Sequence, residues 1–166
     1  MSDRSKKIFL AIAIILPFLV YCVYYYGVMI KNAPYKFTEF DSITLKYGTG
    51  DSLVNQYNSK TGKYVYLDNR DSLVVKNVRL NKDDLLYLHR KAVTLGFWDF
   101  PEQLSGSATA ERHQNIPRYY LEYKYQRKSK KLLFDADFNG DPKLKGAAKL
   151  LIDEVQKTLK DAEDRG

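Results

Sequence analysis

The pattern of apolar and polar positions opens with an unbroken apolar stretch from Ile8 to Ile30, which holds 23 residues and no formal charge. A helix of this length spans roughly 35 Å at about 1.5 Å per residue, and the hydrocarbon core of a bilayer is about 30 Å thick. The stretch therefore predicts a transmembrane helix. Pro17 lies near its middle, where it either marks a helix-packing site or is tolerated without a purpose.

Alternation of apolar and polar residues then predicts three strands in a meander. Ile43, Leu45 and Tyr47 share one face of the first strand, which ends at two glycines. The second strand is short and covers 64–66, and the third covers 72–80 behind a turn. Stronger alternation follows in residues 119–125 and 132–138, and these two strands predict a β-hairpin with a basic turn.

Two later stretches have the apolar spacing of amphipathic helices. Asn81 is a suitable cap for the first, which we expect to begin at Lys82 and to stop at Gly96. Asp141 and Pro142 are suitable as the cap and first residue of the second. The order strands, helix, strands, helix predicts an α+β fold, in which a mostly antiparallel sheet carries two helices on one face.

The apolar stretch has the features of an anchor that is not cleaved. No small residues precede a cleavage site, and Tyr21 stands where a lipoprotein signal has a small residue before its cysteine, here Cys22. Aromatic residues gather toward the far end of the stretch, as in the belt that forms at a membrane interface. The predicted belt consists of Tyr21, Tyr24, Tyr25 and Tyr26.

Positive charges flank the stretch on both sides, three of them in the first seven residues. A short amino-terminal tail is typical of a signal-anchor, so we expect the amino terminus to be cytoplasmic and the protein to lie in a bacterial inner (plasma) membrane. The predicted organisation is a cytoplasmic tail (1–7), a transmembrane signal-anchor helix (8–30), a short linker (31–36) and a single extracytoplasmic domain (37–163).

The charge of the chain and the length of the linker limit the classes of partner that we expect. The chain has a net charge of +7, part of which flanks the apolar stretch, so the domain is too weakly basic to indicate a nucleic-acid partner. We expect membrane lipid to contact residues 8–30 and another membrane or envelope protein to contact the domain. The linker can extend to roughly 20 Å at most, which keeps the domain close to the bilayer.

One segment matches the first half of a calcium loop: Asp135, Asp137, Asn139 and Gly140. The second half fails, because Gly146 occupies the position of the bidentate glutamate. We therefore interpret the two aspartates as residues on the solvent face of a strand and predict no metal or cofactor.

The remaining polar residues form no recognisable catalytic motif. His89 and His113 lack a second metal ligand at a suitable spacing, and Ser105 and Ser107 lack the nucleophile elbow of a hydrolase. We expect no catalytic residues and no enzymatic activity.

Two clusters are candidates for contact with a partner. The basic turn of the predicted hairpin suits anionic headgroups or an acidic partner, unless its charges are merely solvated. An aromatic cluster after the helix that begins at Lys82 either packs at an edge of the core or forms a binding lip. The clusters are Arg127, Lys128, Lys130 and Lys131, and Phe97, Trp98 and Phe100.

These features favour a non-enzymatic accessory or interaction protein with one membrane span, whose domain docks on a membrane complex or envelope partner. The alternative is a membrane-tethered module that binds an envelope polymer or a small molecule. An enzyme is a more distant third reading.

Overall fold

The protein, seen here as a computed structural model that describes residues 3–31, 35–106 and 115–166, divides into two units, Met1–Tyr35 and Lys36–Gly166. The first unit contains the helix α1 (Asp3–Lys31). Its segment Arg4–Gly27 is long and apolar enough to cross a membrane, although a signal sequence has the same properties. The helix begins before Ile8, inside the predicted tail. Residues 32–34 of the predicted linker lie outside the described residues.

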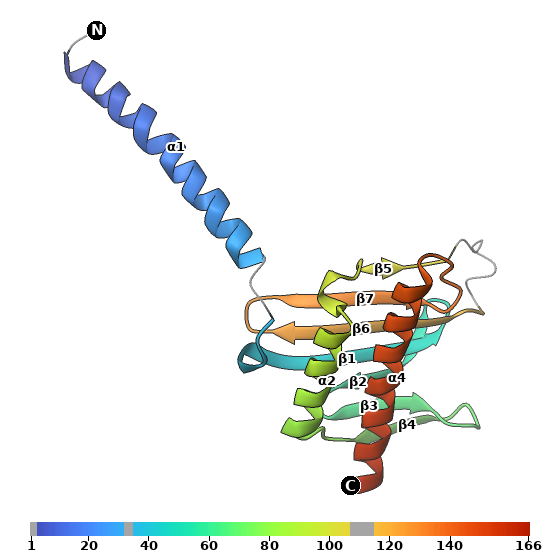
Figure 1. The fold of residues 1–166 in the computed structure, drawn as a ribbon. Helices are drawn as coiled ribbons and strands as arrows, with labels where there is room; N and C mark the ends of the chain where they lie inside the picture. The colour runs from blue at the N-terminus through green and yellow to red at the C-terminus, as the bar shows by residue number, and fades with distance from the viewer. Residues whose placement is uncertain (1–2, 32–34, 107–114) are drawn as a thin grey trace. The chain divides into compact units, whose positions relative to one another are not determined.

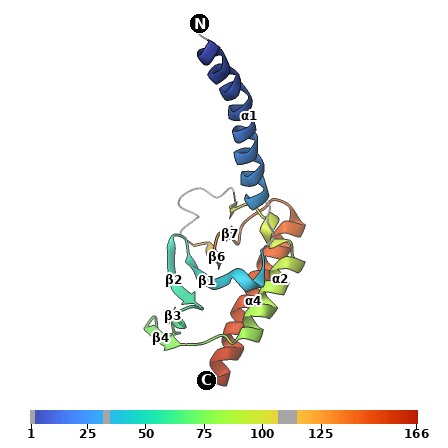
Figure 2. The ribbon, with the colours of Figure 1, turned by 90° about the vertical axis from the view of Figure 1, so that its left-hand side faces the viewer.

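The second unit is a two-layer α+β domain, as the sequence predicts (Figure 1). Its seven strands have the order β4-β3-β2-β1-β6-β7-β5, and only β5 and β7 pair in parallel. Helices α2 (Lys82–Thr94) and α4 (Pro142–Arg165) lie on one face of the sheet (Figures 1 and 2). The strands are β1 (Phe40–Thr49), β2 (Ser52–Asn58), β3 (Lys63–Leu67), β4 (Leu73–Asn77), β5 (Gln103–Leu104), β6 (Pro117–Tyr125) and β7 (Ser129–Asp135).

The first meander has four strands, because the two glycines that seemed to end β1 form a hairpin turn into β2. At Gly48 an added Cβ would lie 1.9 Å from the carbonyl oxygen of Ser52, so the two strands approach too closely for a side chain. Gly50 has a φ of 56°, which glycine adopts without strain. The predicted strand over 72–80 is shorter than expected and is limited to β4.

The predicted hairpin over 119–125 and 132–138 is present as β6 and β7, although β7 already ends at Asp135. Beyond that point the amide of Ala136 donates to the carbonyl of Pro117, and the chain turns. The other side of β6 pairs with β1, where Leu45 lies opposite Leu121. The hairpin therefore joins the first meander in one continuous sheet.

Both predicted helix starts are correct, because each has a side-chain cap. At α2 the Asn81 side chain accepts from the amide of Asp84, and the Asp84 side chain accepts from the amide of Asn81. At α4 the Asp141 side chain accepts from the amide of Lys143, with proline at the first helical position.

The core lies between the helices and the face of the sheet that they cover. Its side chains come from both layers, and fully burying one aliphatic side chain contributes roughly 1.5–3 kcal/mol. The members without exposed surface include Ile43, Leu45, Leu121, Tyr123 and Leu132 from the sheet, and Leu88, Leu151 and Val155 from the helices.

Two short 3₁₀ helices complete the domain. The first, η1 (Phe37–Glu39), precedes β1, and the second, η2 (Phe97–Asp99), follows α2. Gly96 has a φ of 71° between α2 and η2, which agrees with the predicted stop of the first helix there.

Candidate functional site

The most distinctive surface of the domain is the second face of the sheet. Within the described residues of the second unit, α2 and α4 both cover the first face, and no helix of that unit lies over the second (Figure 2). Strand register shows which residues point to this open face. Lys46 pairs with Gln56 on one side and with Tyr120 on the other, so the three side chains lie in one row across β2, β1 and β6.

The centre of this face holds a hollow of about 430 Å³, which we call the open-face groove. Most of its lining is polar and comes from neighbouring strands. The residues that line it are Thr44, Lys46, Gln56, Tyr57, Asn58, Thr61, Lys63, Val65, Tyr120 and Glu122.

Side chains in the groove hold one another in place. The hydroxyl of Tyr120 donates to Oε2 of Glu122 at 3.1 Å, and Nζ of Lys46 lies 5.9 Å from the centre of the Tyr120 ring. Nδ2 of Asn58 donates to the hydroxyl of Thr44 at 3.1 Å. Such a fixed set of donors, acceptors and one aromatic ring suits the recognition of a polar or extended segment.

The phenol of Tyr120 stays neutral at any physiological pH. Partial burial and the neighbouring carboxylate of Glu122 raise the pKa of Tyr120 to about 12. The hydroxyl therefore acts as a hydrogen-bond donor in the groove and not as a base.

A largely buried ion pair lies at one end of the open face. Arg118 of β6 donates from Nε to Oδ1 of Asp135 at 2.6 Å and from Nη2 to Oδ2 at 3.1 Å. The side chain of Asp135 is only 1% exposed, and Asp51 from the β1–β2 turn also pairs with Arg118. These carboxylates raise the pKa of Arg118, so the guanidinium remains charged.

The expectation that Asp135 lies on a solvated face is therefore wrong, because the bidentate pair with Arg118 occupies its carboxylate. Asp137 lies beyond the strand, and its Oδ1 is buried without a hydrogen-bond partner. A Cβ at Gly106 would lie 2.3 Å from the Asp137 carboxylate, so a larger residue there would displace this carboxylate. The described residues contain no group of three or more ligands that could hold a metal.

The cations of the basic turn are not a free cluster. Arg127 pairs with Glu39 and thereby lowers the pKa of that carboxyl group. Lys130 donates to the backbone carbonyl of Phe100, whereas Lys128 is half-buried and Lys131 exposed. Register places Lys131 opposite Glu122, next to the open-face groove. Contact of this turn with a partner or with lipid stays a prediction.

The aromatic cluster after α2 contributes to the core. Phe97 is fully buried, Phe100 is 7% exposed, and Trp98 is half-buried against the rings of Tyr123 and Tyr125 at 5.7 Å each. Of these three side chains, only Trp98 is partly accessible to a binding partner.

The four tyrosines of the predicted interface belt lie in α1 with exposed rings. The rings of Tyr21 and Tyr25 are stacked, with their centres 6.1 Å apart, and the ring of Tyr26 meets that of Tyr25 edge-on. The tyrosine rings therefore gather at one level of α1, and their place at a membrane interface stays a prediction.

Two of the residues considered for catalysis, His89 and Ser105, are among the described residues, and each has a hydrogen-bond partner outside this set. His89 is buried, its Nδ1 lies 2.7 Å from the hydroxyl of Tyr125, and burial lowers its pKa. Ser105 accepts a hydrogen bond from Gln103. His113 and Ser107 lie outside the described residues.

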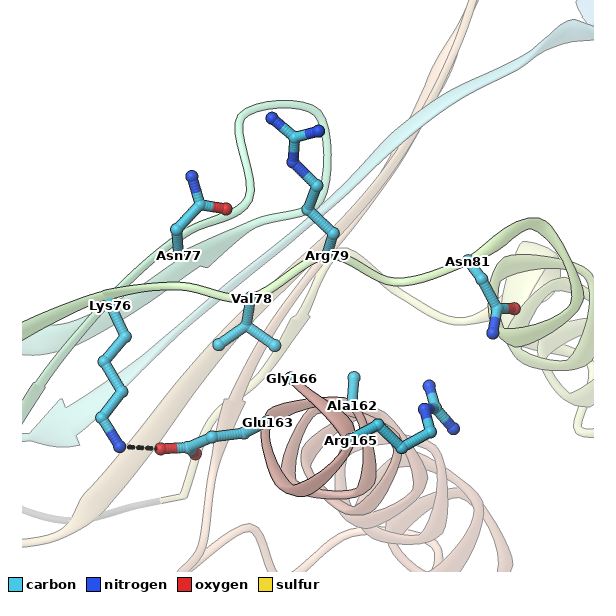
Figure 3. Close-up of a pocket in the computed structure, with 9 residues that line it drawn as sticks. All are labelled: Lys76, Asn77, Val78, Arg79, Asn81, Ala162, Glu163, Arg165 and Gly166. Atoms are coloured by element: carbon cyan, nitrogen blue, oxygen red, sulfur yellow. Dashed lines mark hydrogen bonds and ion pairs between the residues drawn. The ribbon is translucent and has the colours of Figure 1, made fainter.

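Two other hollows are less suited to a ligand. One of about 600 Å³ lies between β4 and the last turns of α4, and Figure 3 shows Lys76 paired there with Glu163. Arg165 also lines it and pairs with Asp84. The second, beside Tyr119, measures about 200 Å³, below the roughly 300 Å³ of typical ligand sites.

Sequence reasoning missed the open-face groove. Its signal was present in the polar positions of β1 and β6, where Lys46, Tyr120 and Glu122 alternate with the core residues. The register between distant strands decides that these side chains meet, and alternation within one strand does not contain it.

The sequence matches no protein-family model and no curated protein.

Proposed function

We propose that this protein is a membrane-anchored, non-enzymatic interaction protein whose domain docks on a membrane or envelope partner through the open-face groove. The observation that carries the proposal is the groove itself, which holds a fixed set of polar side chains on the sheet face that α2 and α4 do not cover. Buried polar groups are costly unless they are paired, so partners that match such a set are favoured over others.

The anchor sets where the docking takes place. We propose that α1 crosses a bacterial inner membrane once, without cleavage, with the amino terminus in the cytoplasm and the domain outside. The length and composition of the helix support the span, and the cations Arg4, Lys6 and Lys7 support the orientation. Protease added to spheroplasts should digest the domain. Protection in spheroplasts with digestion only after lysis would reverse the orientation.

A second candidate function has its own support. The groove volume of about 430 Å³ falls within the range of small-molecule sites, roughly 300–1,000 Å³, and its lining is rich in hydrogen-bonding groups. A membrane-tethered module that binds an envelope polymer or a small polar molecule would use the same surface.

The test is purification of the full-length protein in mild detergent, followed by quantification of stoichiometric companions. Lys46→Glu and Tyr120→Ala alter the groove, while Lys160→Glu makes the same charge reversal on the exposed side of α4. We expect wild type and Lys160→Glu to retain one companion protein and both groove variants to lose it.

Other outcomes are equally informative. A protein that purifies alone and binds envelope polysaccharide through the groove would support the second candidate. A companion retained by both groove variants as firmly as by wild type would refute docking at the groove.

A further inference from the structure

The outer edge of β4 is a row of backbone groups without a neighbouring strand, since β4 is the last strand in the sheet order. The amide of Asp68 donates to the carbonyl of Ser72, which identifies one of the hydrogen-bonded pairs between β3 and β4. Such pairs alternate with pairs whose N–H and C=O groups point away. Leu73, Val75 and Asn77 therefore direct their backbone groups to the free edge.

The side chains of the same strand make this edge apolar on the open face. Leu73 is 62% exposed and Val75 is 59% exposed. They continue two apolar rows that cross the neighbouring strands and stop at the edge. We call this set the β4 patch: Val54, Val65, Leu67, Leu73 and Val75.

The usual protection of a sheet edge is missing at β4. The opposite edge, β5, has only two residues and follows Pro101, so it offers little backbone for pairing. The one lysine of β4, Lys76, points to the helix side and pairs with Glu163, as Figure 3 shows. An exposed apolar edge is an aggregation hazard unless a partner covers it, so we expect β4 to be covered in the working protein.

We infer that β4 pairs in antiparallel fashion with β4 of a second copy of this chain, with the two-fold axis at Val74. In this register Leu73 of each copy lies opposite Val75 of the other, and these residues have the outward N–H and C=O groups that the new hydrogen bonds require. Each apolar row then continues into an apolar row of the second copy.

Charge at the two ends of the strand favours a second copy over an unrelated segment. Asp71 precedes β4 and Arg79 follows it, and neither has a charged partner among the described residues. Figure 3 shows Arg79 and Asn77 directed away from α4, toward the open face. The two-fold axis brings Asp71 of each copy to the Arg79 end of the other, so both charges gain a partner.

The β4 patch borders the open-face groove, because Val65 belongs to both. The pairing can still be tested apart from the docking function proposed above, because Lys46 and Tyr120, which the docking test changes, lie on the central strands β1 and β6. An edge of five residues buries less than the roughly 1,200 Å² of a stable interface, so it is weak between freely diffusing domains. Anchorage of both copies in one bilayer raises their effective concentration and favours the pair.

The test is disulfide formation between full-length chains in membranes, with Cys22→Ser as the background. A directly opposed pair without mutual hydrogen bonds has Cα atoms about 4.5 Å apart, within the range of roughly 4.4–6.8 Å for disulfides. We expect Val74→Cys to form a covalent dimer on mild oxidation. Val75→Cys and Val54→Cys should form far less, because the register separates these positions from their copies.

A second substitution shows whether the dimer depends on the edge. Adding Val75→Lys to Val74→Cys should lower the yield of covalent dimer at least about fivefold, because a charged side chain on an edge strand disfavours pairing with another strand. Val93→Lys, a matched change on the exposed side of α2, should leave the yield unchanged. Lys46→Glu should also leave it unchanged, even where it removes a docked companion.

Two results would overturn the inference: a Val74→Cys yield no higher than that of Val54→Cys, or a higher yield for Val75→Cys than for Val74→Cys. Thermal unfolding of each variant, followed by the fluorescence of Trp98, should show a folded domain, so a missing dimer cannot be attributed to unfolding.

Discussion

The two faces of the sheet differ although the same strands build both. Leu121 of β6 is fully buried under the helices, whereas its neighbours Tyr120 and Glu122 line the open-face groove. On the covered face, side chains interlock with a second layer; on the open face, they hydrogen-bond sideways to their neighbours. The covered face therefore contributes most of the folding stability. Substitutions in the open-face groove should cost little stability and should mainly affect binding of a partner.

The largest effect should come from truncating a covered residue. Leu121→Ala should lower the free energy of unfolding by about 3 kcal/mol, because it removes a buried side chain and leaves a cavity. Leu73→Ala, the same change at a residue 62% exposed, should cost less than about 0.5 kcal/mol. Urea unfolding of the full chain in detergent, followed by Trp98 fluorescence, measures both. Equal losses of unfolding free energy in the two variants would contradict the difference between the two faces.

The ion pair between Arg118 and Asp135, at one end of the open face, should give the next largest effect on stability. Asp135→Asn leaves the Arg118 guanidinium without its bidentate partner in a half-buried position and should cost about 2 kcal/mol. Asp51→Asn, at a side chain 95% exposed, should cost almost nothing by the same unfolding measurement. A harmless Asp135→Asn would mean that this end of the face is solvated like the rest.

The helical layer was largely predictable from the sequence, because each helix carries a cap that acts locally. Asn81 and Asp141 identify the two starts without knowledge of the rest of the fold. β2 was missed for the opposite reason. Its polar residues, among them Asn55 and Gln56, disfavour a strand by themselves, and pairing with β1 and β3 holds them there.

The candidate site was less predictable, because long-range pairing determines it. The run of cations at the hairpin turn was visible in the sequence, yet Glu39, which neutralises Arg127, lies 88 positions away. Asp135 likewise belongs to a pattern that suggests a solvated strand, and Arg118 on the neighbouring strand changes its environment. Only the register of the folded sheet supplies such partners.

The helical layer should also give a smaller, pH-dependent effect through His89. Burial lowers the pKa of this histidine below its usual 6.5, so the folded state keeps it neutral where the unfolded chain already binds a proton. Stability from this residue is complete above pH 6.5 and is lost as the pH falls toward the lowered pKa.

Melting temperatures at pH 7.5 and 5.5 check this expectation. The window lies above the titration of Glu39, Asp41 and Glu154, whose pKa values are all lowered by hydrogen-bonding partners. Wild type should melt at a lower temperature at pH 5.5, and His89→Gln should reduce that difference. The same pH dependence in both proteins would exclude His89 as its source.

The smallest effect on stability should come from the groove. Tyr120→Phe removes one hydrogen bond to Glu122 on a partly solvated surface and should cost about 0.5 kcal/mol in urea unfolding. Lys46→Glu should change stability by no more than this. A loss of several kcal/mol in either variant would show that the groove supports the fold instead of serving a partner.

The most direct test of the docking face is site-specific photo-crosslinking of the full-length protein in intact membranes. A photoreactive residue replaces Lys46 or Gln56 in the open-face groove, and Lys157 or Lys160 on the exposed side of α4. We expect a discrete crosslinked partner from the two groove positions and none from the two helix positions. A partner captured only from the helix positions, or equally from all four, would contradict docking through the open face.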